Sequence, residues 1–223
     1  MPLAPNIERE KTMWVQQIKL AFNSHVLLKC IGLTIFISLF FTAYFYVLNH
    51  PAFPVTVIPN TYLDRLIGFQ PLALPIYLSL WVYVAFPAML TIKLRELYEF
   101  TLSIALMSTV GLVIFYFWPT TIPVNEIDWA LHPSINFLKS VDAAGNACPS
   151  LHVATALFSG AWLGYILRRT NAPFWVKAIN IIWCVSIIYS TLATRQHVVL
   201  DVLGGLVLAS ISILLARQLF WQE

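Results

Sequence analysis

The chain has 223 residues, of which 59% are hydrophobic and only 10% are charged, and its mean hydropathy is +0.77. A soluble domain carries about 25% charged residues, so the composition excludes an ordinary soluble domain and indicates a polytopic membrane protein. The net charge of +3 does not indicate a nucleic-acid partner. None of the cysteines (Cys30, Cys148 and Cys184) has metal-ligand spacing with another, so we interpret all of them as packing residues.

The amino-terminal segment, residues 1–25, is predicted to be cytoplasmic and to precede one membrane domain over residues 26–223. Residues 7–24 place apolar side chains on one side of a helix, which predicts an amphipathic helix in the headgroup region. A disordered cytoplasmic tail is the alternative interpretation. The apolar positions are Met13, Trp14, Val15, Ile18 and Phe22.

Six apolar runs follow, each close to the length of about 20 residues that a bilayer core requires. We therefore expect an all-α protein with six transmembrane helices. The prolines in the second run, Pro75 and Pro87, are expected to kink it rather than break it. The runs are Val26–Leu48, Leu72–Ile92, Phe100–Trp118, Ser150–Leu167, Phe174–Leu192 and Val198–Ala216.

The distribution of basic residues predicts the orientation of these helices. With both termini in the cytoplasm, the cytoplasmic side has ten lysines and arginines and the opposite side has three, as the positive-inside rule requires. The three are Arg65, Lys139 and Arg195. This orientation places the loop 119–149 and the turn before the sixth run on the extracytoplasmic side. We expect an integral protein of a bacterial cytoplasmic membrane or its equivalent.

Two polar stretches interrupt the apolar sequence on that side. The first is Cys148-Pro149-Ser150-Leu151-His152. Ser150 directly precedes an apolar run and is typical of a helix N-cap. Because a helix amino terminus attracts anions, Ser150 and His152 could bind a phosphate there. Taken alone, the stretch could equally be an ordinary cap beside an interfacial histidine.

The second polar stretch contains Arg195, His197 and Asp201 at the start of the sixth run. Ionisable groups at such a position indicate a functional site. His197 and Asp201 are four residues apart and would share a helix face, so the carboxylate can orient the imidazole for nucleophilic attack. Arg195 suits phosphate oxygens. A structural Arg–Asp pair is the alternative, but two such stretches on one face favour a single site.

Other chemistries fit the chain less well. The five histidines are too few for a clustered di-iron site, and a zinc site needs three or four protein ligands, although His132 could contribute one. A serine hydrolase would require a G-x-S-x-G motif, which the sequence lacks. We therefore expect neither a metal nor a cofactor.

The two stretches together resemble the signatures of the type 2 phosphatidic acid phosphatase superfamily, which includes lipid phosphate phosphatases. Residues 149–152 are similar to its P-S-G-H signature, and residues 194–201 to its S-R signature followed by H-x-x-x-D. Gly204 and Gly205 follow as a helix-packing pair. The resemblance covers the chain from about Leu72 onward.

The resemblance implies a metal-independent enzyme with a role for each residue. His197 would attack phosphorus and form a phosphohistidine, oriented by Asp201. His152 would protonate the leaving alcohol. Ser150 and Arg195 would hold the phosphate oxygens, with the helix dipole in place of a cation.

Leu151 stands where the family usually has glycine, and Arg195 precedes His197 by two residues instead of six. Both features resemble the inositol phosphorylceramide synthase branch. Leu151 is included among the substrate-binding residues.

The family's first signature, a lysine and an arginine-proline after the third helix, is missing. The corresponding stretch, residues 117–124, has no basic residue. Lys139 or Arg65 could substitute by folding over the site, and we include Lys139 among the candidate substrate-binding residues.

Three functions stay open at this stage. The first is a membrane phosphatase acting on phosphatidate, phosphatidylglycerophosphate or a polyprenyl pyrophosphate. The second is a phosphotransferase moving a phosphate-bearing head group between lipids. The third is a non-catalytic protein that binds anionic lipid head groups. The expected partners are the bilayer and a phosphorylated lipid, and not a nucleic acid.

Overall fold

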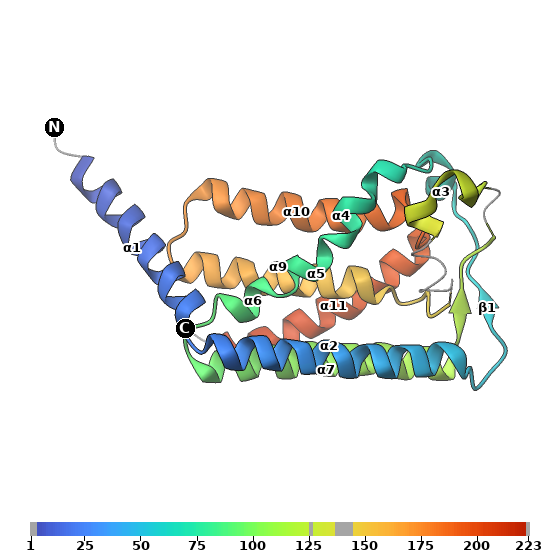
Figure 1. The fold of residues 1–223 in the computed structure, drawn as a ribbon, viewed down its shortest axis with the longest axis horizontal. Helices are drawn as coiled ribbons and strands as arrows, with labels where there is room; N and C mark the ends of the chain where they lie inside the picture. Colours follow the sequence, from blue (N-terminus) through green and yellow to red (C-terminus); the bar gives the residue numbers. More distant parts are fainter. Residues whose placement is uncertain (1–3, 125–126, 137–144, 222–223) are drawn as a thin grey trace.

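Long apolar helices run side by side in the computed structural model, which describes residues 4–124, 127–136 and 145–221. They form an elongated bundle, and α1 leans away from one end of it (Figure 1). The helices are α1 (Ala4–Asn23), α2 (Val26–Asn49), α3 (Tyr62–Leu66), η1 (Pro71–Ala73), α4 (Leu74–Leu78), α5 (Leu80–Tyr83), α6 (Phe86–Met89), α7 (Leu94–Phe117), η2 (Trp129–Leu131), α9 (Leu151–Arg169), α10 (Phe174–Ala193) and α11 (Val199–Phe220). The strands are β1 (Thr56–Val57) and β2 (Thr120–Thr121).

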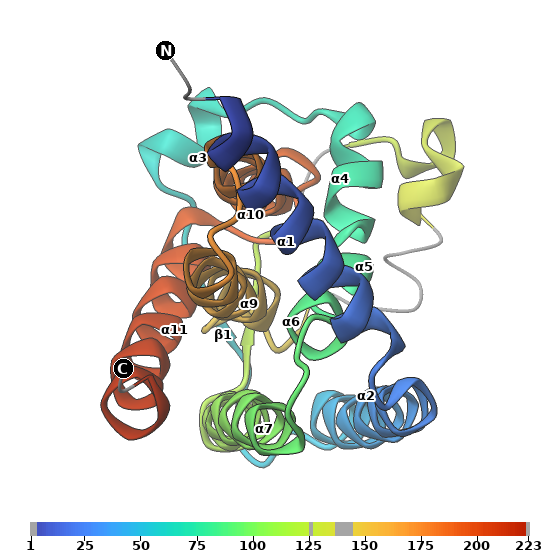
Figure 2. The same ribbon diagram turned by 90° about the vertical axis from the view of Figure 1, so that its left-hand side faces the viewer.

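Helix α9 lies in the middle of the bundle (Figure 2). It packs against α10, α11, α7, α6 and α5, and small residues on its surface make this possible. A Cβ atom at Gly160 would lie 2.7 Å from the Tyr83 hydroxyl and 3.0 Å from Cys184 Sγ. The Gly160 carbonyl accepts a hydrogen bond from Asn180 Nδ2 at 3.0 Å, and Tyr83 donates to Asn180 Oδ1 at 2.6 Å. Polar contacts therefore join α5, α9 and α10 inside the bundle.

Five segments of the described chain are long and apolar enough to cross a membrane: Val26–Asn49, Pro71–Met89, Leu94–Phe117, Phe174–Ala193 and Val199–Phe220. They match five of the six predicted runs, and several apolar helices of this length fit a membrane protein. Helix α9 covers the remaining run and is not among the five, because it is less apolar on average than its neighbours, although its 19 residues equal the length of Pro71–Met89.

The second predicted run follows one path but is not a regular helix. It consists of η1, α4, α5 and α6 in succession. Pro75 and Pro87 lie in the first turns of α4 and α6, where a missing N–H leaves no helical hydrogen bond unmade. The run is therefore divided into short helices rather than only kinked, with a proline at the start of α4 and of α6 and a further break at Ser79, where no proline occurs.

The third predicted run begins at Leu94 rather than at Phe100. The additional turns contain charged residues that form ion pairs. Arg95 Nε lies 2.7 Å from Glu99 Oε1, and Glu96 Oε2 lies 2.7 Å from Arg169 Nη2 at the end of α9. The hydropathy pattern does not reveal such turns, because charged residues end an apolar run even where the helix continues.

The amino-terminal segment forms α1, followed by a turn at Ser24 and His25. Trp14 and Ile18 pack against the main core, and the Trp14 ring meets the Trp175 ring edge-on at 6.4 Å. The placement of α1 in a headgroup layer stays a prediction.

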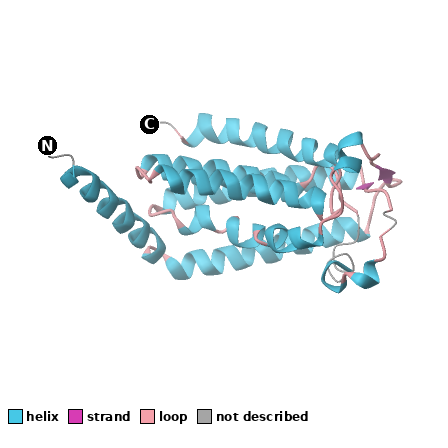
Figure 3. Cartoon of the chain, turned by 90° about the horizontal axis from the view of Figure 1, so that it is seen from above, coloured by secondary structure: helices cyan, strands magenta, loops and turns pink. Residues whose placement is uncertain are grey.

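The irregular parts of the chain and both strands gather at the end of the bundle opposite α1 (Figure 3). Strands β1 and β2 pair in parallel, with Thr56 opposite Thr120 and Val57 opposite Thr121. Both polar stretches lie at this end, since they precede α9 and α11. The paired strands and α3 cover the same end (Figure 1).

Candidate active site

Ser150 is the N-cap of α9, as its sequence position predicts. Its side chain is completely buried and accepts a hydrogen bond from the Val153 N–H at 3.2 Å. The Ser150 N–H donates to the Asp201 carbonyl at 3.0 Å. Both polar stretches are thus joined directly through the backbone.

The close approach of α9 and α11 depends on Gly205. A Cβ atom at this position would collide with the Ser150 carbonyl oxygen and would lie 3.1 Å from Val153 Cβ. The absence of a side chain lets α11 contact the backbone at the start of α9. The glycine pair noted in the sequence therefore packs beside the site.

Arg195 lies in the turn that ends α10 and has a left-handed backbone with φ of 56°. The Gln196 N–H donates to the Thr191 carbonyl and the Arg195 N–H donates to the Leu192 carbonyl, both at 3.1 Å. This pattern is a Schellman motif, in which glycine usually occupies the left-handed position. An arginine there costs about 1–2 kcal/mol of backbone strain, which favours a functional role for its side chain.

His197 and Asp201 are in contact, although not within one helix as the spacing suggested. Helix α11 begins at Val199, so His197 precedes it. Asp201 is completely buried, and its Oδ2 accepts from the Val198 N–H at 3.1 Å and lies 3.4 Å from His197 Nδ1. The carboxylate thereby caps α11 and orients the imidazole at the same time. With Nδ1 directed to Asp201, Nε2 is the nitrogen available for other chemistry.

Asp64, which the sequence analysis did not select, holds the second polar stretch in place. It is 2% exposed and lies in α3. Its carboxylate accepts from the Thr61 N–H and Oγ1, both at 2.7 Å, and from the Val199 N–H at 2.8 Å. Its carbonyl accepts from Arg195 Nη1 at 2.7 Å. The Thr61–Asp64 spacing is that of a capping box, a sequence signal from which α3 could have been predicted.

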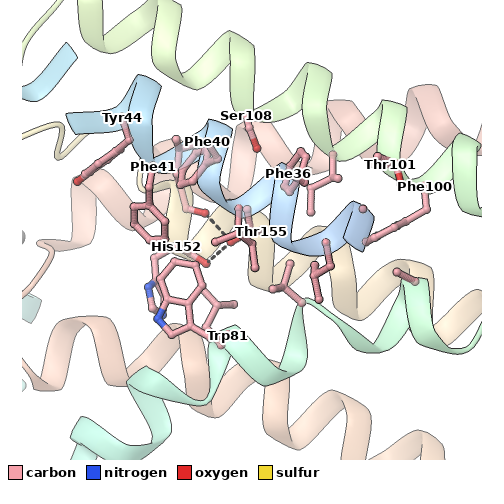
Figure 4. A pocket seen from close by; sticks show the side chains of 18 of the residues that line it. Phe36, Phe40, Phe41, Tyr44, Trp81, Phe100, Thr101, Ser108, His152 and Thr155 are labelled. Atoms are coloured by element: carbon pink, nitrogen blue, oxygen red, sulfur yellow. Dashed lines mark hydrogen bonds between the residues drawn. The ribbon is translucent and has the colours of Figure 1, made fainter. Parts of the chain in front are cut away.

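His152, in the first turn of α9, lies on the same cavity as His197. Its ring stacks on Tyr77 with centroids 4.0 Å apart, and Trp81 meets it edge-on at 6.4 Å. Both His152 and His197 line one cavity of about 230 Å³, and Figure 4 shows His152 beside Trp81 at its end. Within the described part of the chain, the buried atoms His152 Nε2 and Asp201 Oδ1 have no hydrogen-bond partner.

The stretch that carries basic residues in the resembled signature has a structural role here. Thr120 of β2 is completely buried, and its Oγ1 accepts from the Cys148 N–H at 2.8 Å. The Thr120 carbonyl accepts from the Ala147 N–H at 3.2 Å. Strand β2 therefore fixes the backbone that leads into Ser150. Burial, with a smaller contribution from the Asp201 carboxylate, raises the pKa of the Cys148 thiol to about 11.

The remaining candidates lie in different places. Leu151 is buried against Gly111 of α7 and also contributes to the cavity wall. Arg65 is exposed. Lys139 lies outside the described residues. Among residues 4–124, 127–136 and 145–221, no group of three or more His, Cys, Asp and Glu side chains is placed to hold a metal ion.

A family model described as PAP2 superfamily matches residues 69–215, about two thirds of the chain. The chain belongs to the PAP2 superfamily. Members of this superfamily are phosphatases or phosphotransferases, so the chain is a phosphatase-like membrane enzyme. The resemblance found from the two polar stretches is thereby confirmed. Comparisons with curated proteins and with solved structures give no significant match. Helices α2 and α3, including Asp64, lie before the matched region.

Proposed function

We propose that the chain is an integral membrane lipid phosphatase that hydrolyses a phosphorylated lipid through a phosphohistidine on the extracytoplasmic face. The observation that carries the proposal is that His197, in contact with the buried Asp201, lines the same cavity as His152. A nucleophile with an orienting carboxylate and a second histidine are the groups that phosphoryl transfer without a metal requires.

In the first step, His197 Nε2 attacks the phosphorus atom. The bond between Nε2 and phosphorus forms as the bond between phosphorus and the lipid oxygen breaks. Asp201 keeps the proton on Nδ1 and stabilises the charge that the imidazole acquires. His152 gives a proton to the leaving oxygen. In the second step, water attacks the phosphohistidine, its proton passes to His152, and inorganic phosphate leaves.

The charge on the phosphate oxygens requires donors that are fixed before the reaction. Arg195 supplies a permanent charge. Its hydrogen bond to the Asp64 carbonyl holds the guanidinium group against α3. Ser150 and the amino terminus of α9 supply further donors. Lys139, in the loop before the first stretch, is proposed as an additional contact.

Six membrane spans, with α9 added to the five apolar segments named above, and both termini in the cytoplasm are part of this proposal. Ten of thirteen basic residues fall on the side assigned to the cytoplasm. Helix α1 and the carboxyl end of α11 lie at the opposite end of the bundle from the polar stretches (Figure 1). The positive-inside rule then assigns the site to the extracytoplasmic face.

The test is phosphate release by the purified protein in detergent with a chelator present. The substrates are phosphatidate, phosphatidylglycerophosphate and a polyprenyl pyrophosphate. We expect release from at least one of them, and a loss of at least 10³-fold in His197→Ala. His50→Ala is the matched control, because His50 is exposed at the end of α2. Unchanged turnover in His197→Ala contradicts the proposal, and binding without turnover favours a non-catalytic lipid-binding protein.

A second candidate function is transfer of a phosphate-bearing head group to another lipid. It is favoured by residues 117–124, which contain no basic residue and in which Thr120 supports the backbone. A site with fewer cations holds a phosphomonoester dianion less well than a diester. Adding diacylglycerol or ceramide as acceptor distinguishes the two functions, since a transferase forms a new phospholipid and a phosphatase releases only phosphate.

A further inference from the structure

The cavity that contains the two histidines extends along α2 and away from the polar end of the bundle. Its walls are aromatic and aliphatic side chains from α2, α4–α7 and α9. Figure 4 shows His152 and Trp81 toward one end, Phe100 and Thr101 toward the other, and Phe36 and Phe40 between them. We call this cavity the slot.

The slot is long. Tyr44 lines it at the histidine end and Lys29 at the far end, and these residues are fifteen positions apart on α2, or about 22 Å. Half of a hydrocarbon core is about 15 Å, so the slot reaches past the middle of a bilayer.

The far end of the slot is closed by Lys29. This side chain is 3% exposed, and its Nζ donates to the carbonyls of Ala21 at 2.8 Å, Met89 at 3.0 Å and Thr91 at 2.7 Å. The three bonds fix the ammonium group between α2, the end of α1 and the end of α6. An apolar chain that displaced it would leave a buried charge without its acceptors, so the slot has a polar floor.

The side of the slot is open to the surroundings of the bundle. Trp81, which lines it, is 40% exposed, and α2 is mostly exposed along its length. In a bilayer these surfaces meet lipid chains, which provide a route by which a chain can enter sideways. The apolar lining and the position of both histidines at one end fit a lipid whose phosphate reacts while its chain lies in the slot.

We propose that the slot binds a long hydrocarbon chain of the phosphorylated lipid substrate, and that Lys29 sets the maximum length of that chain. This inference rests on the proposed function and adds to it a limit on the chain length of the substrate. Helix α2, which forms the outer wall of the slot, lies outside the region that matches the family model.

The experiment narrows the slot near its floor. Gly32 lines the slot one turn from Lys29, and a Cβ atom there would meet no other atom within 4 Å, so Gly32→Leu adds a side chain at this wall of the slot without a collision. Ser38→Leu is the matched control, since Ser38 is exposed on α2 and is not among the residues that line the slot. The substrates are octyl phosphate and hexadecyl phosphate. Gly32 is about 18 Å along α2 from Tyr44, which an extended octyl chain does not reach and an extended hexadecyl chain does.

We expect the ratio of kcat/KM for hexadecyl phosphate to that for octyl phosphate to fall at least about tenfold in Gly32→Leu. Each methylene group expelled from the slot lowers affinity about fourfold. The ratio should stay at the wild-type value in Ser38→Leu. An unchanged ratio in Gly32→Leu overturns the proposal.

Binding measured separately distinguishes failure of the slot from failure of the proposed function. Retention of hexadecyl phosphate is measured by native mass spectrometry for the wild type, His197→Ala and both leucine variants. If none of the substrates is hydrolysed but Gly32→Leu alone loses retention, the slot stands and the proposed function fails. If hydrolysis depends on His197 but retention and chain selectivity are the same in all leucine variants, the slot fails and the proposed function stands.

Discussion

Replacement of Gly205 by alanine tests whether close contact between α9 and α11 builds the site. The new Cβ atom would collide with the Ser150 carbonyl and would approach Val153 Cβ to 3.1 Å, whereas carbon atoms prefer about 3.5–4.0 Å. The two helices must therefore move apart by several tenths of an ångström at the point where Ser150 and Asp201 are hydrogen-bonded.

The change in stability that Gly205→Ala causes follows from two opposing contributions. Overpacking of this kind costs about 1–3 kcal/mol, while alanine in a helix is about 1 kcal/mol more favourable than glycine. Gly164→Ala isolates the second contribution, because the nearest atoms to its Cβ would be 3.7 and 3.8 Å away. The difference between the two variants is then the overpacking alone, or roughly 2–12 °C in thermal midpoint.

The assay is thermal unfolding in detergent together with phosphate release. We expect Gly205→Ala to unfold at a lower temperature than Gly164→Ala and to lose roughly tenfold or more in turnover, since small displacements of reacting groups are costly. Gly164→Ala should retain wild-type turnover. Equal midpoints and equal turnover in the two variants would show that the helices do not need this close contact.

Three further changes probe single groups. Asp201→Asn should lower turnover by on the order of 10³-fold or more, because an amide at this position no longer holds His197 in one tautomer; turnover within tenfold of wild type would contradict the orienting role. Asp64→Asn should destabilise the protein by about 1–3 kcal/mol, since an amide replaces one of the oxygens that accept from Thr61 and Val199, and an unchanged unfolding midpoint would refute this. The Cys148 thiol, whose pKa is raised to about 11, should stay protonated at pH 7 and react with N-ethylmaleimide more slowly than the exposed Cys30, which peptide mass spectrometry can follow; equally rapid labelling of both at pH 7 would contradict the raised pKa.

The long helices could be predicted from the sequence because each apolar run is long enough to cross a bilayer. Their ends were less predictable, as α7 shows: its first turns are held by ion pairs that include Arg169, a residue far away in the sequence. The run with Pro75 and Pro87 was expected to be one kinked helix, and the structure divides it. A proline can lie in the first turn of a new helix or can kink a continuous one, and the sequence does not decide between these two structures.

The residues of the candidate site could be predicted from the sequence, but the residues that hold them in place could not. Ser150, His197 and Asp201 could be selected from their types and spacing. The role of Asp64 depends on a contact with Val199 across 135 positions of the chain, and that of Thr120 on the pairing of two short strands. Strands of two residues carry no periodicity that a sequence could reveal. The slot likewise arises from helices that are distant in sequence.

The modest hydropathy of α9 has a consequence for how the protein is made. The described helices that meet the length and hydropathy criteria can partition into a bilayer on their own merits, whereas α9 cannot rely on its composition and is held among α7, α10 and α11. In the proposed arrangement of six spans, the insertion of α9 is completed by association with α10 and α11, which follow it in the chain. A nascent chain that ends after Arg169 would lack both α10 and α11. The contacts of Asp201 with Ser150 and with His197 therefore form only after the synthesis of α11 has begun.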